Sequence, residues 1–189
     1  MLRSNYMKSI DIRLKPNETT ILKSFIGNKM HSYQHDEFNF TPTSSQAVSI
    51  AMDGDESYYL YSFTEVQDYF GTPEDVAVWS FTKEKLPIID HKSFISTPVD
   101  ETIKGIKIIQ ENQRVYRGDE QTYDVWVTRG IIFDLGDREI AFEKDTWFSE
   151  QIIVHRGYDL ISQFAPAEKF GEDWDTSVRT ECNRTVIEL

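Results

Sequence analysis

The sequence predicts an α+β protein built predominantly on antiparallel β-sheet, with hairpin connections and two or three short helices. Short segments in which apolar and polar residues alternate recur along the chain, as half-buried strands require. Glycine-containing polar turns separate several of these segments, which is typical of hairpins. The alternation of strands with long helices that a doubly wound parallel sheet needs is missing. We therefore expect roughly six to eight strands in all.

A strand and a short helix are the first expected elements. Segment 8–14 carries isoleucine or leucine at every second position, which predicts a strand with one buried face. Asn17 then precedes a short helix expected at 18–25, which Gly27 would end.

Two strands are next expected at 47–52 and 57–63, with the polar turn Asp-Gly-Asp-Glu at 53–56 between them. A four-residue loop fixes the cross-strand register, and aromatic residues then face β-branched ones. The expected pairs are Ile50 with Tyr59 and Val48 with Tyr61.

The middle of the chain predicts a helix, a strand and a long connection. Residues 64–69 are expected to form a short helix, and residues 76–81 a strand. The stretch 83–100 contains two prolines and is expected to be an extended connection. The length of the whole chain suits one domain. We therefore treat residues 1–189 as a single domain, with a candidate subdomain break near 83–100.

The second half of the chain contains the clearest hairpin signal. Strands are expected at 105–110 and 122–128, and a hairpin follows at 131–143 with Gly136-Asp137 as its two-residue turn. The expected register pairs Phe133 with Ile140 and Ile131 with Phe142. A strand at 151–155 and a short helix at 158–164 follow, and the last twenty residues are too polar to predict an element.

The same hairpin places Asp134 directly opposite Glu139, on the face away from Phe133. Like charges at such positions repel each other. The pair is therefore a candidate to bind a divalent cation, to share a proton as a catalytic dyad, or to receive a basic residue of a partner protein. Solvent screening without any function is the simpler alternative. Arg138 is expected on the opposite face and hence not to neutralise the pair.

A second candidate binding site is the acidic run with a central aromatic residue near the C-terminus. It consists of Glu172, Asp173, Trp174 and Asp175. A tryptophan among charged residues can anchor a protein interface, although core packing of its ring is equally compatible with the pattern. The tyrosines within 58–61 form a further aromatic group with the same two interpretations.

No cofactor or metal site is expected from the motifs. His31 and His35 are four residues apart, but Ser32 stands where a zinc metalloprotease helix has glutamate. The turn 53–56 lacks the later positions of a calcium loop. His155 ends an apolar run and is a candidate general base. Nucleophile-elbow, phosphate-loop and dinucleotide motifs are missing from the sequence.

The net charge of −12 bears on the classes of partner to expect. Both halves of the chain are acidic, which disfavours direct binding of nucleic acid and of anionic membranes. It suits a basic protein partner, or solubility alone. A single cysteine, Cys182, and the lack of a signal peptide or membrane-spanning stretch predict a cytoplasmic protein.

These observations favour a non-catalytic acidic protein-binding module, such as an inhibitor or immunity-type protein that neutralises a basic partner. The alternative is a carboxylate- or metal-dependent hydrolase whose site contains Asp134, Glu139 and His155. A small structural or phage-type accessory protein is the third hypothesis. The sequence sets neither the partner nor the oligomeric state.

Overall fold

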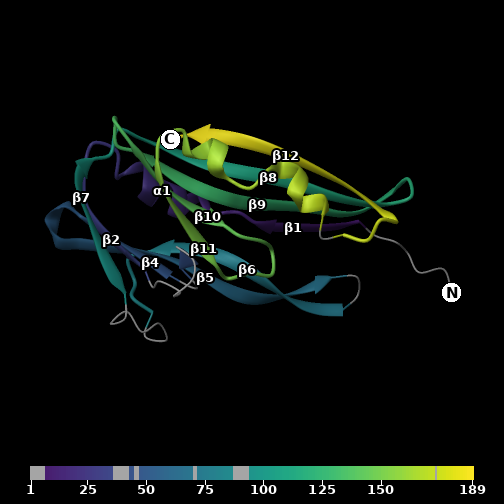
Figure 1. The fold of residues 1–189 in the computed structure, drawn as a ribbon. Coiled ribbons are helices and arrows are strands. Elements are labelled where there is room, and N and C mark those ends of the chain that lie inside the picture. The colour runs from purple at the N-terminus through teal and green to yellow at the C-terminus, as the bar shows by residue number, and fades with distance from the viewer. Residues whose placement is uncertain (1–6, 36–42, 45–46, 70–71, 87–93, 173) are drawn as a thin grey trace.

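Two β-sheets lie face to face in the computed structural model of this chain (Figure 1). The structure describes residues 7–35, 43–44, 47–69, 72–86, 94–172 and 174–189. Nearly all strand pairs are antiparallel, so the expected antiparallel sheet is confirmed. The helical part is smaller than expected, because α1 (Pro16–Lys23) is the single α-helix of the described parts and the other helical elements are 3-10 turns.

The first sheet, sheet A, has the strand order β12-β8-β9-β10-β11-β3, and β1 pairs with β9 in parallel. Its strands are β1 (Lys8–Ile12), β3 (Thr43–Ser44), β8 (Gly105–Arg117), β9 (Glu120–Asp134), β10 (Glu139–Lys144), β11 (Ile152–Gly157) and β12 (Val178–Glu188). The polar C-terminal region, for which no element was predicted, is therefore an eleven-residue edge strand.

The second sheet, sheet B, has the order β6-β5-β4-β2-β7. Its strands are β2 (Lys29–His35), β4 (Ala47–Met52), β5 (Glu56–Tyr69), β6 (Thr72–Thr82) and β7 (Ile95–Thr102). The helix predicted at 64–69 is wrong, because β5 continues through these residues and pairs with β6 as far as Tyr69. The connection predicted at 83–100 ends early, since β7 begins at Ile95.

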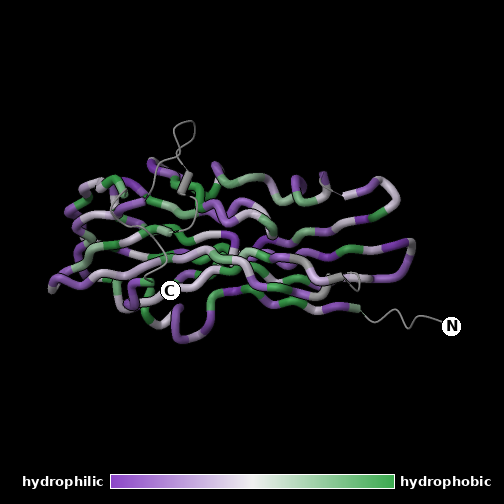
Figure 2. Tube along the Cα trace, turned by 90° about the horizontal axis from the view of Figure 1, so that it is seen from below, coloured by the Kyte–Doolittle hydropathy of each residue, from purple (hydrophilic) through white to green (hydrophobic). Residues whose placement is uncertain are grey.

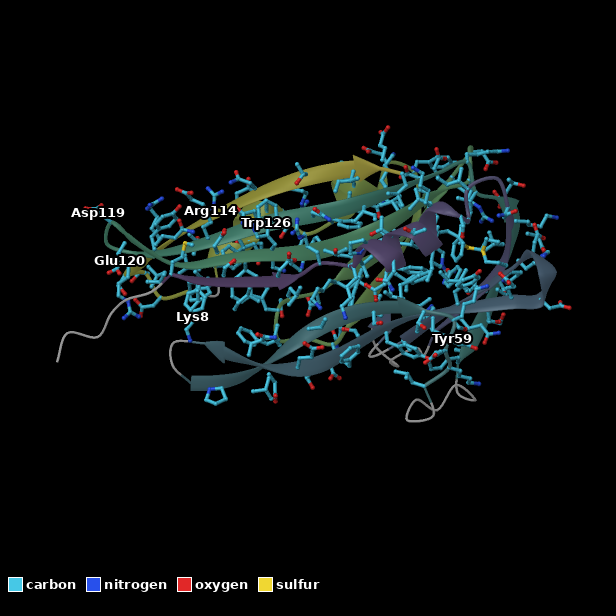
Figure 3. The ribbon with its side chains drawn as sticks, turned by 180° about the vertical axis from the view of Figure 1, so that it is seen from behind. Lys8, Tyr59, Arg114, Asp119, Glu120 and Trp126 are labelled. Carbon is cyan, nitrogen blue, oxygen red and sulfur yellow. The ribbon has the colours of Figure 1, made fainter. Side chains whose placement is uncertain are left out.

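Hydrophobic and hydrophilic residues alternate along the strands, as expected for sheets with one buried face (Figure 2). Side chains of both sheets project into the space between them (Figure 3). They form the main core, among them Tyr33, Leu60, Ile108, Phe133 and Phe142. Helix α1 is anchored on sheet B by Glu18, whose carboxylate accepts hydrogen bonds from the main-chain N–H of Lys15 and of Phe81.

The two predicted hairpin registers have opposite outcomes. The 131–143 hairpin is confirmed, with Phe133 opposite Ile140 and Ile131 opposite Phe142. The register of β4 and β5 is wrong by one residue, and the observed pairs are Ile50 with Tyr58 and Val48 with Leu60. Glu56 belongs to β5 and pairs with Met52, so the turn has three residues instead of four.

A β-bulge in the centre of sheet A positions one side chain for the site described below. Consecutive residues of β8 pair with Gly130 and Thr128, so that Arg129 is one extra residue on β9. Bulges bend a strand and redirect the side chain of the extra residue. No helix in the described ranges is long and apolar enough to cross a lipid bilayer.

Candidate functional site

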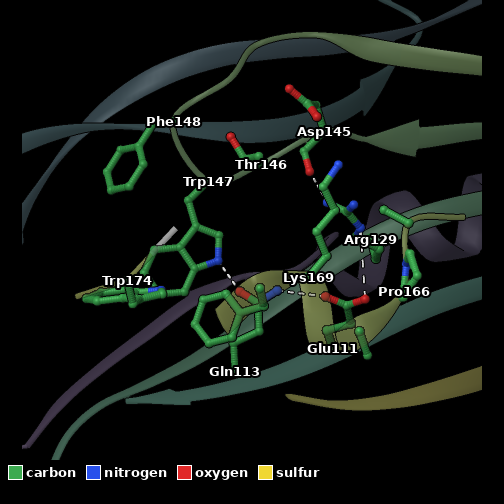
Figure 4. A pocket seen from close by; sticks show the side chains of 13 residues that line it. Glu111, Gln113, Arg129, Asp145, Thr146, Trp147, Phe148, Pro166, Lys169 and Trp174 are labelled. Atoms are coloured by element: carbon green, nitrogen blue, oxygen red, sulfur yellow. Dashed lines mark hydrogen bonds and ion pairs between the residues drawn. The ribbon is translucent and has the colours of Figure 1, made fainter. Parts of the chain in front are cut away.

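A pocket of about 510 Å³ lies between sheet A and the segments that cover its strands β8 and β9. Trp147, one of its lining residues, also contacts sheet B, because its carbonyl oxygen accepts the N–H of Ala77 on β6. Three segments build it: the side chains of β8 and β9, the loop 145–148 after β10, and the segment 165–174, which crosses the sheet before β12. We call residues 158–172 and 174–177, which lie between β11 and β12 in the sequence and contribute to the pocket lining, the strap. Figure 4 shows Trp147 and Trp174 on one side of the pocket and Arg129, Asp145 and Pro166 on the other.

Aromatic rings form one wall of the pocket. Trp147 lies 5.3 Å from the ring centre of Phe170 and 5.9 Å from that of Trp174, and the latter two rings are 5.9 Å apart. These tilted and edge-to-face contacts stabilise one another and hold the indole faces in place. Phe148 is 55% exposed and extends this wall to the rim.

The floor of the pocket is a chain of buried polar groups. The indole N–H of Trp147 donates to Gln113 Oε1, and Gln113 Nε2 donates to Glu111 Oε2 at 2.6 Å. The other oxygen of Glu111 accepts two hydrogen bonds from the guanidinium of Arg184 on β12, at 2.9 and 2.6 Å. Because Glu111 is 2% exposed, this pairing is what makes a charge at that position tolerable.

The bulged residue Arg129 links the floor to the loop 145–148. Its Nη2 donates to Glu143 Oε1 at 3.0 Å, and its Nη1 donates to the carbonyl oxygen of Asp145. Its Nε lies 3.9 Å from Glu111 Oε1 and is a buried donor without a hydrogen-bond acceptor in the described part of the chain. The guanidinium of Arg129 therefore contacts the carboxylates of Glu143 and Glu111 and the main-chain carbonyl of Asp145.

The strap is fixed to sheet A by the same network. Glu143 Oε1 accepts the main-chain N–H of Ala165 at 2.9 Å, and Arg184 Nη2 donates to the Ala165 carbonyl at 2.5 Å. Just before it, Phe164 stacks on the His155 ring at 5.5 Å. The main-chain N–H and carbonyl of Ala165 are thus both bonded to charged side chains of sheet A. These bonds fix the position of the strap residues that come next in the sequence and line the pocket.

Exposed acidic residues of the strap flank the lining of the pocket in the sequence. Asp145 lines it, and its carboxylate makes no hydrogen bond to any described residue. Glu168, Glu172 and Asp175 are exposed next to lining residues of the strap. Lys169 is the one basic side chain of the strap that lines the pocket.

The structure places the predicted acidic and aromatic run at this pocket. Trp174 lines it, and Glu172 and Asp175 lie exposed on either side of that residue. Hydrogen bonds from the main-chain N–H and the side chain of Ser177 lower the pKa of Asp175. Asp173 lies outside the described residues.

Asp134 and Glu139 are opposite each other, as the register predicted. Lys107 on β8 donates to Glu139 Oε1 at 2.9 Å, and this hydrogen bond raises the pKa of Lys107. The other Glu139 oxygen accepts the N–H of Leu160, which begins a turn of the strap. Lys107 is thus a cation of the protein itself that partly neutralises the pair of Asp134 and Glu139. Arg138 instead pairs with Glu101.

The histidines are engaged by different carboxylates. His155 Nε2 lies 2.7 Å from Glu143 Oε2 and contacts neither carboxylate that the hydrolase hypothesis assigns to it. His31 lies between Asp100 and Asp53, at 2.9 and 3.0 Å. His35, on the same strand, is buried at 1% exposure. The described residues contain no group of three or more histidine, cysteine or acidic side chains suited to a metal ion.

Sequence reasoning missed Glu111, Gln113, Arg129 and Trp147. The gap between the strands predicted at 122–128 and 131–135 was a usable signal, because the unassigned Arg129 between them is the bulge. The remaining members come from segments far apart in the sequence, and only the tertiary structure brings them together. Burial and the neighbouring Glu111 raise the pKa of Cys182 to about 12, so that this thiol is not an activated nucleophile.

No family model, no curated protein and no solved structure matches this chain. The proposal that follows therefore rests on the geometry of the site alone.

Proposed function

We propose that this protein is a non-catalytic binding module for a basic protein partner, and that it seats a cationic side chain of that partner in the aromatic pocket. The observation that carries the proposal is the combination of an aromatic wall with the acidic residue Asp145, which lines the facing side. Cations are attracted to the faces of indole and phenyl rings, most strongly to tryptophan. An unpaired carboxylate within the same pocket adds a hydrogen-bond acceptor for the cation.

The charge of the surroundings supports the same class of partner. The chain carries a net charge of −12, and the exposed residues Glu168, Glu172 and Asp175 stand next to lining residues of the pocket in the sequence. A field of this sign accelerates encounter with a cationic surface and makes association sensitive to salt. We propose that such binding serves an inhibitor or immunity-type role, in which this protein covers and neutralises its basic partner.

The floor of the pocket explains why the site is suited to binding rather than to catalysis. Glu111 and Glu143 each already accept several hydrogen bonds from arginine, amide or main-chain donors. The oxygens of both carboxylates are therefore occupied by partners within the protein. They fix the pocket walls and leave recognition to the rings and to Asp145.

The test measures fluorescence anisotropy of labelled octa-arginine and octa-lysine peptides with the full chain, and octa-glutamate serves as the anionic control. We expect Asp145→Asn and Trp174→Ala each to weaken binding of a cationic peptide by about tenfold, equivalent to about 1.4 kcal/mol. Tyr158→Ala is the matched control, because Tyr158 is 73% exposed and lies outside the pocket lining.

Charge reversal at Lys169 distinguishes a pocket that binds a cation from one that binds an anion. If the ligand is a cation, Lys169→Glu removes repulsion at the pocket and tightens binding. Weaker binding of cationic peptides by this variant, together with binding of octa-glutamate by the unaltered protein, would show that the pocket takes an anion on Lys169 and Arg129. An equal effect of Trp174→Ala and Tyr158→Ala would also contradict the proposal.

A further inference from the structure

A second group of polar side chains is buried on the other side of sheet A, between the two sheets. Lys144 ends β10 and follows Ile140 and Phe142 on the strand face that points into the main core. It is 1% exposed, and its Nζ has no hydrogen-bond partner in the described part of the chain. Nζ lies 5.7 Å from the ring centre of Trp79 on sheet B.

Trp79 has an unsatisfied polar atom of its own. Its indole Nε1 is buried without an acceptor among the described residues, and the same holds for the hydroxyl of Ser62. Ser62 is directly opposite Trp79 in the β5–β6 ladder, and both are 2% exposed. Directly opposed residues of an antiparallel pair project to the same face, so the hydroxyl and the indole share the interior with Lys144.

These three groups have one property in common, which is that each can donate a hydrogen bond. An ammonium and an indole N–H can only donate, and a hydroxyl can donate as well as accept. Buried donors are paired in nearly all native proteins, and an unpaired one costs about 1–3 kcal/mol. Apart from the Ser62 hydroxyl, the cluster consists of donors alone, and it therefore points to an occupant that accepts hydrogen bonds.

The charges near Lys144 favour a negative occupant. Burial and, next, the positive charge of Arg129 lower the pKa of Lys144 to about 7. Asp145 and Glu150 act in the opposite direction and more weakly. The charged form of Lys144 is therefore unfavourable at this position when no counter-ion is present. An anion in contact with Nζ would offset this cost.

We propose that a small monovalent anion of the chloride type binds between the two sheets and accepts hydrogen bonds from Lys144 Nζ, Trp79 Nε1 and Ser62 Oγ. Two hydrogen bonds of about 3 Å that meet at one acceptor bring their donors within about 6 Å of each other, and Nζ lies 5.7 Å from the centre of the indole ring to which Nε1 belongs. A water molecule fits less well, because its two hydrogens need acceptors and the surrounding side chains are apolar.

The proposal links anion binding to protonation of Lys144. A bound anion favours the charged ammonium, and the charged ammonium favours the anion, by the same factor. The anion binds the folded chain and not the unfolded one, so stability must rise with its concentration. The proposed anion ligands are not lining residues of the pocket proposed above, and neither proposal needs the other, although Arg129 and Asp145 of the pocket act on Lys144.

The first experiment follows thermal unfolding of the full chain at constant ionic strength while chloride or bromide replaces gluconate. We expect Tm of the unaltered protein to rise with halide concentration. Lys144→Met should remove this dependence, and Trp79→Phe should reduce it. The control is Lys83→Met, which alters an exposed lysine and should keep the full dependence. A Tm that is the same in chloride and gluconate, or an unchanged halide dependence in Lys144→Met, overturns the proposal.

The second experiment does not depend on any variant folding. Crystals of the unaltered protein grown in bromide should give an anomalous scattering peak in contact with Lys144 Nζ and Trp79 Nε1. An ordinary water at that position, or closure of the space by a rearranged side chain, overturns the proposal.

Discussion

The ring of Phe164 lies against the main chain of Gly130, so closely that a β-carbon on Gly130 would come within 2.2 Å of Phe164 Cε2. Gly130 follows the bulged Arg129, and Phe164 precedes the residue that Glu143 and Arg184 hold. The contact therefore sets how near the strap approaches sheet A at the edge of the pocket.

Gly130→Ala should displace the strap. The added methyl group also meets the carbonyl oxygen of Phe142 at 2.8 Å, so the strand itself offers no room. We expect a loss of about 1–3 kcal/mol in the free energy of unfolding, measured by urea denaturation, and weaker binding of the cationic peptides. Gly105→Ala is the control, because a β-carbon there meets no atom closer than 3.9 Å. Equal stability of the two variants would contradict this account of the strap.

Glu111→Gln should be strongly destabilising. The substitution removes the charge that neutralises Arg184 while the guanidinium stays largely buried, with 18% of its side chain exposed. Loss of one partner of a buried pair costs about 3–5 kcal/mol. Chemical denaturation of this variant beside Lys83→Met, which breaks an exposed pair with Glu56, checks the prediction. The exposed pair should contribute less than about 1 kcal/mol, and a similar cost for both would show that burial is not the deciding factor.

Lys144 gives the protein a pH dependence in halide-free buffer. Its folded-state pKa of about 7 lies below the value of 10.5 for an unperturbed lysine. Between these values the unfolded chain binds more protons than the folded one, so stability rises with pH through this window. We expect Tm to increase from pH 7 to 10, and Lys144→Met to flatten that increase. A rise of equal slope in the variant would assign the effect to other groups.

His31 gives a dependence of the opposite sign. Its hydrogen bond to Asp100, and then the one to Asp53, raise its pKa above the usual 6.5. The stabilisation is complete below the unfolded-state pKa and is lost as the pH rises through the folded-state pKa. Titration of the imidazole by NMR should give a pKa above 6.5 that Asp100→Asn lowers. The same pKa in both proteins would show that the carboxylate does not act on this ring.

The sequence determined the 131–143 hairpin well because its turn leaves little choice. A Gly-Asp pair between alternating strands specifies a two-residue loop, and every cross-strand pair follows. The turn after Met52 is less restrictive, because Glu56 can belong to either the loop or the strand. The structure has Gly54 and Asp55 with positive φ in a three-residue turn, and the one-residue shift alters every pair.

Other elements depend on partners that are distant in the sequence. Residues 64–69 look helical by their cap and glycine signals, but pairing with β6 makes them a strand. The last strand is polar because it lies at the edge of sheet A, where a hydrophobic pattern is not needed. The pocket was only partly predictable: the aromatic residue Trp174 was foreseen, and the buried network beneath it was not.

The pair of Glu111 and Arg184 has a consequence for how the protein is made. The two residues are separated by 73 positions, and β12 pairs with β8 along its whole length. During synthesis β8 leaves the ribosome well before β12, and until then the carboxylate destined for the floor of the pocket lacks its counter-charge. Closure of such long loops slows folding. Sheet A therefore cannot reach its final arrangement strand by strand as it emerges, and the nascent chain must wait for β12 before the strap and the pocket can form.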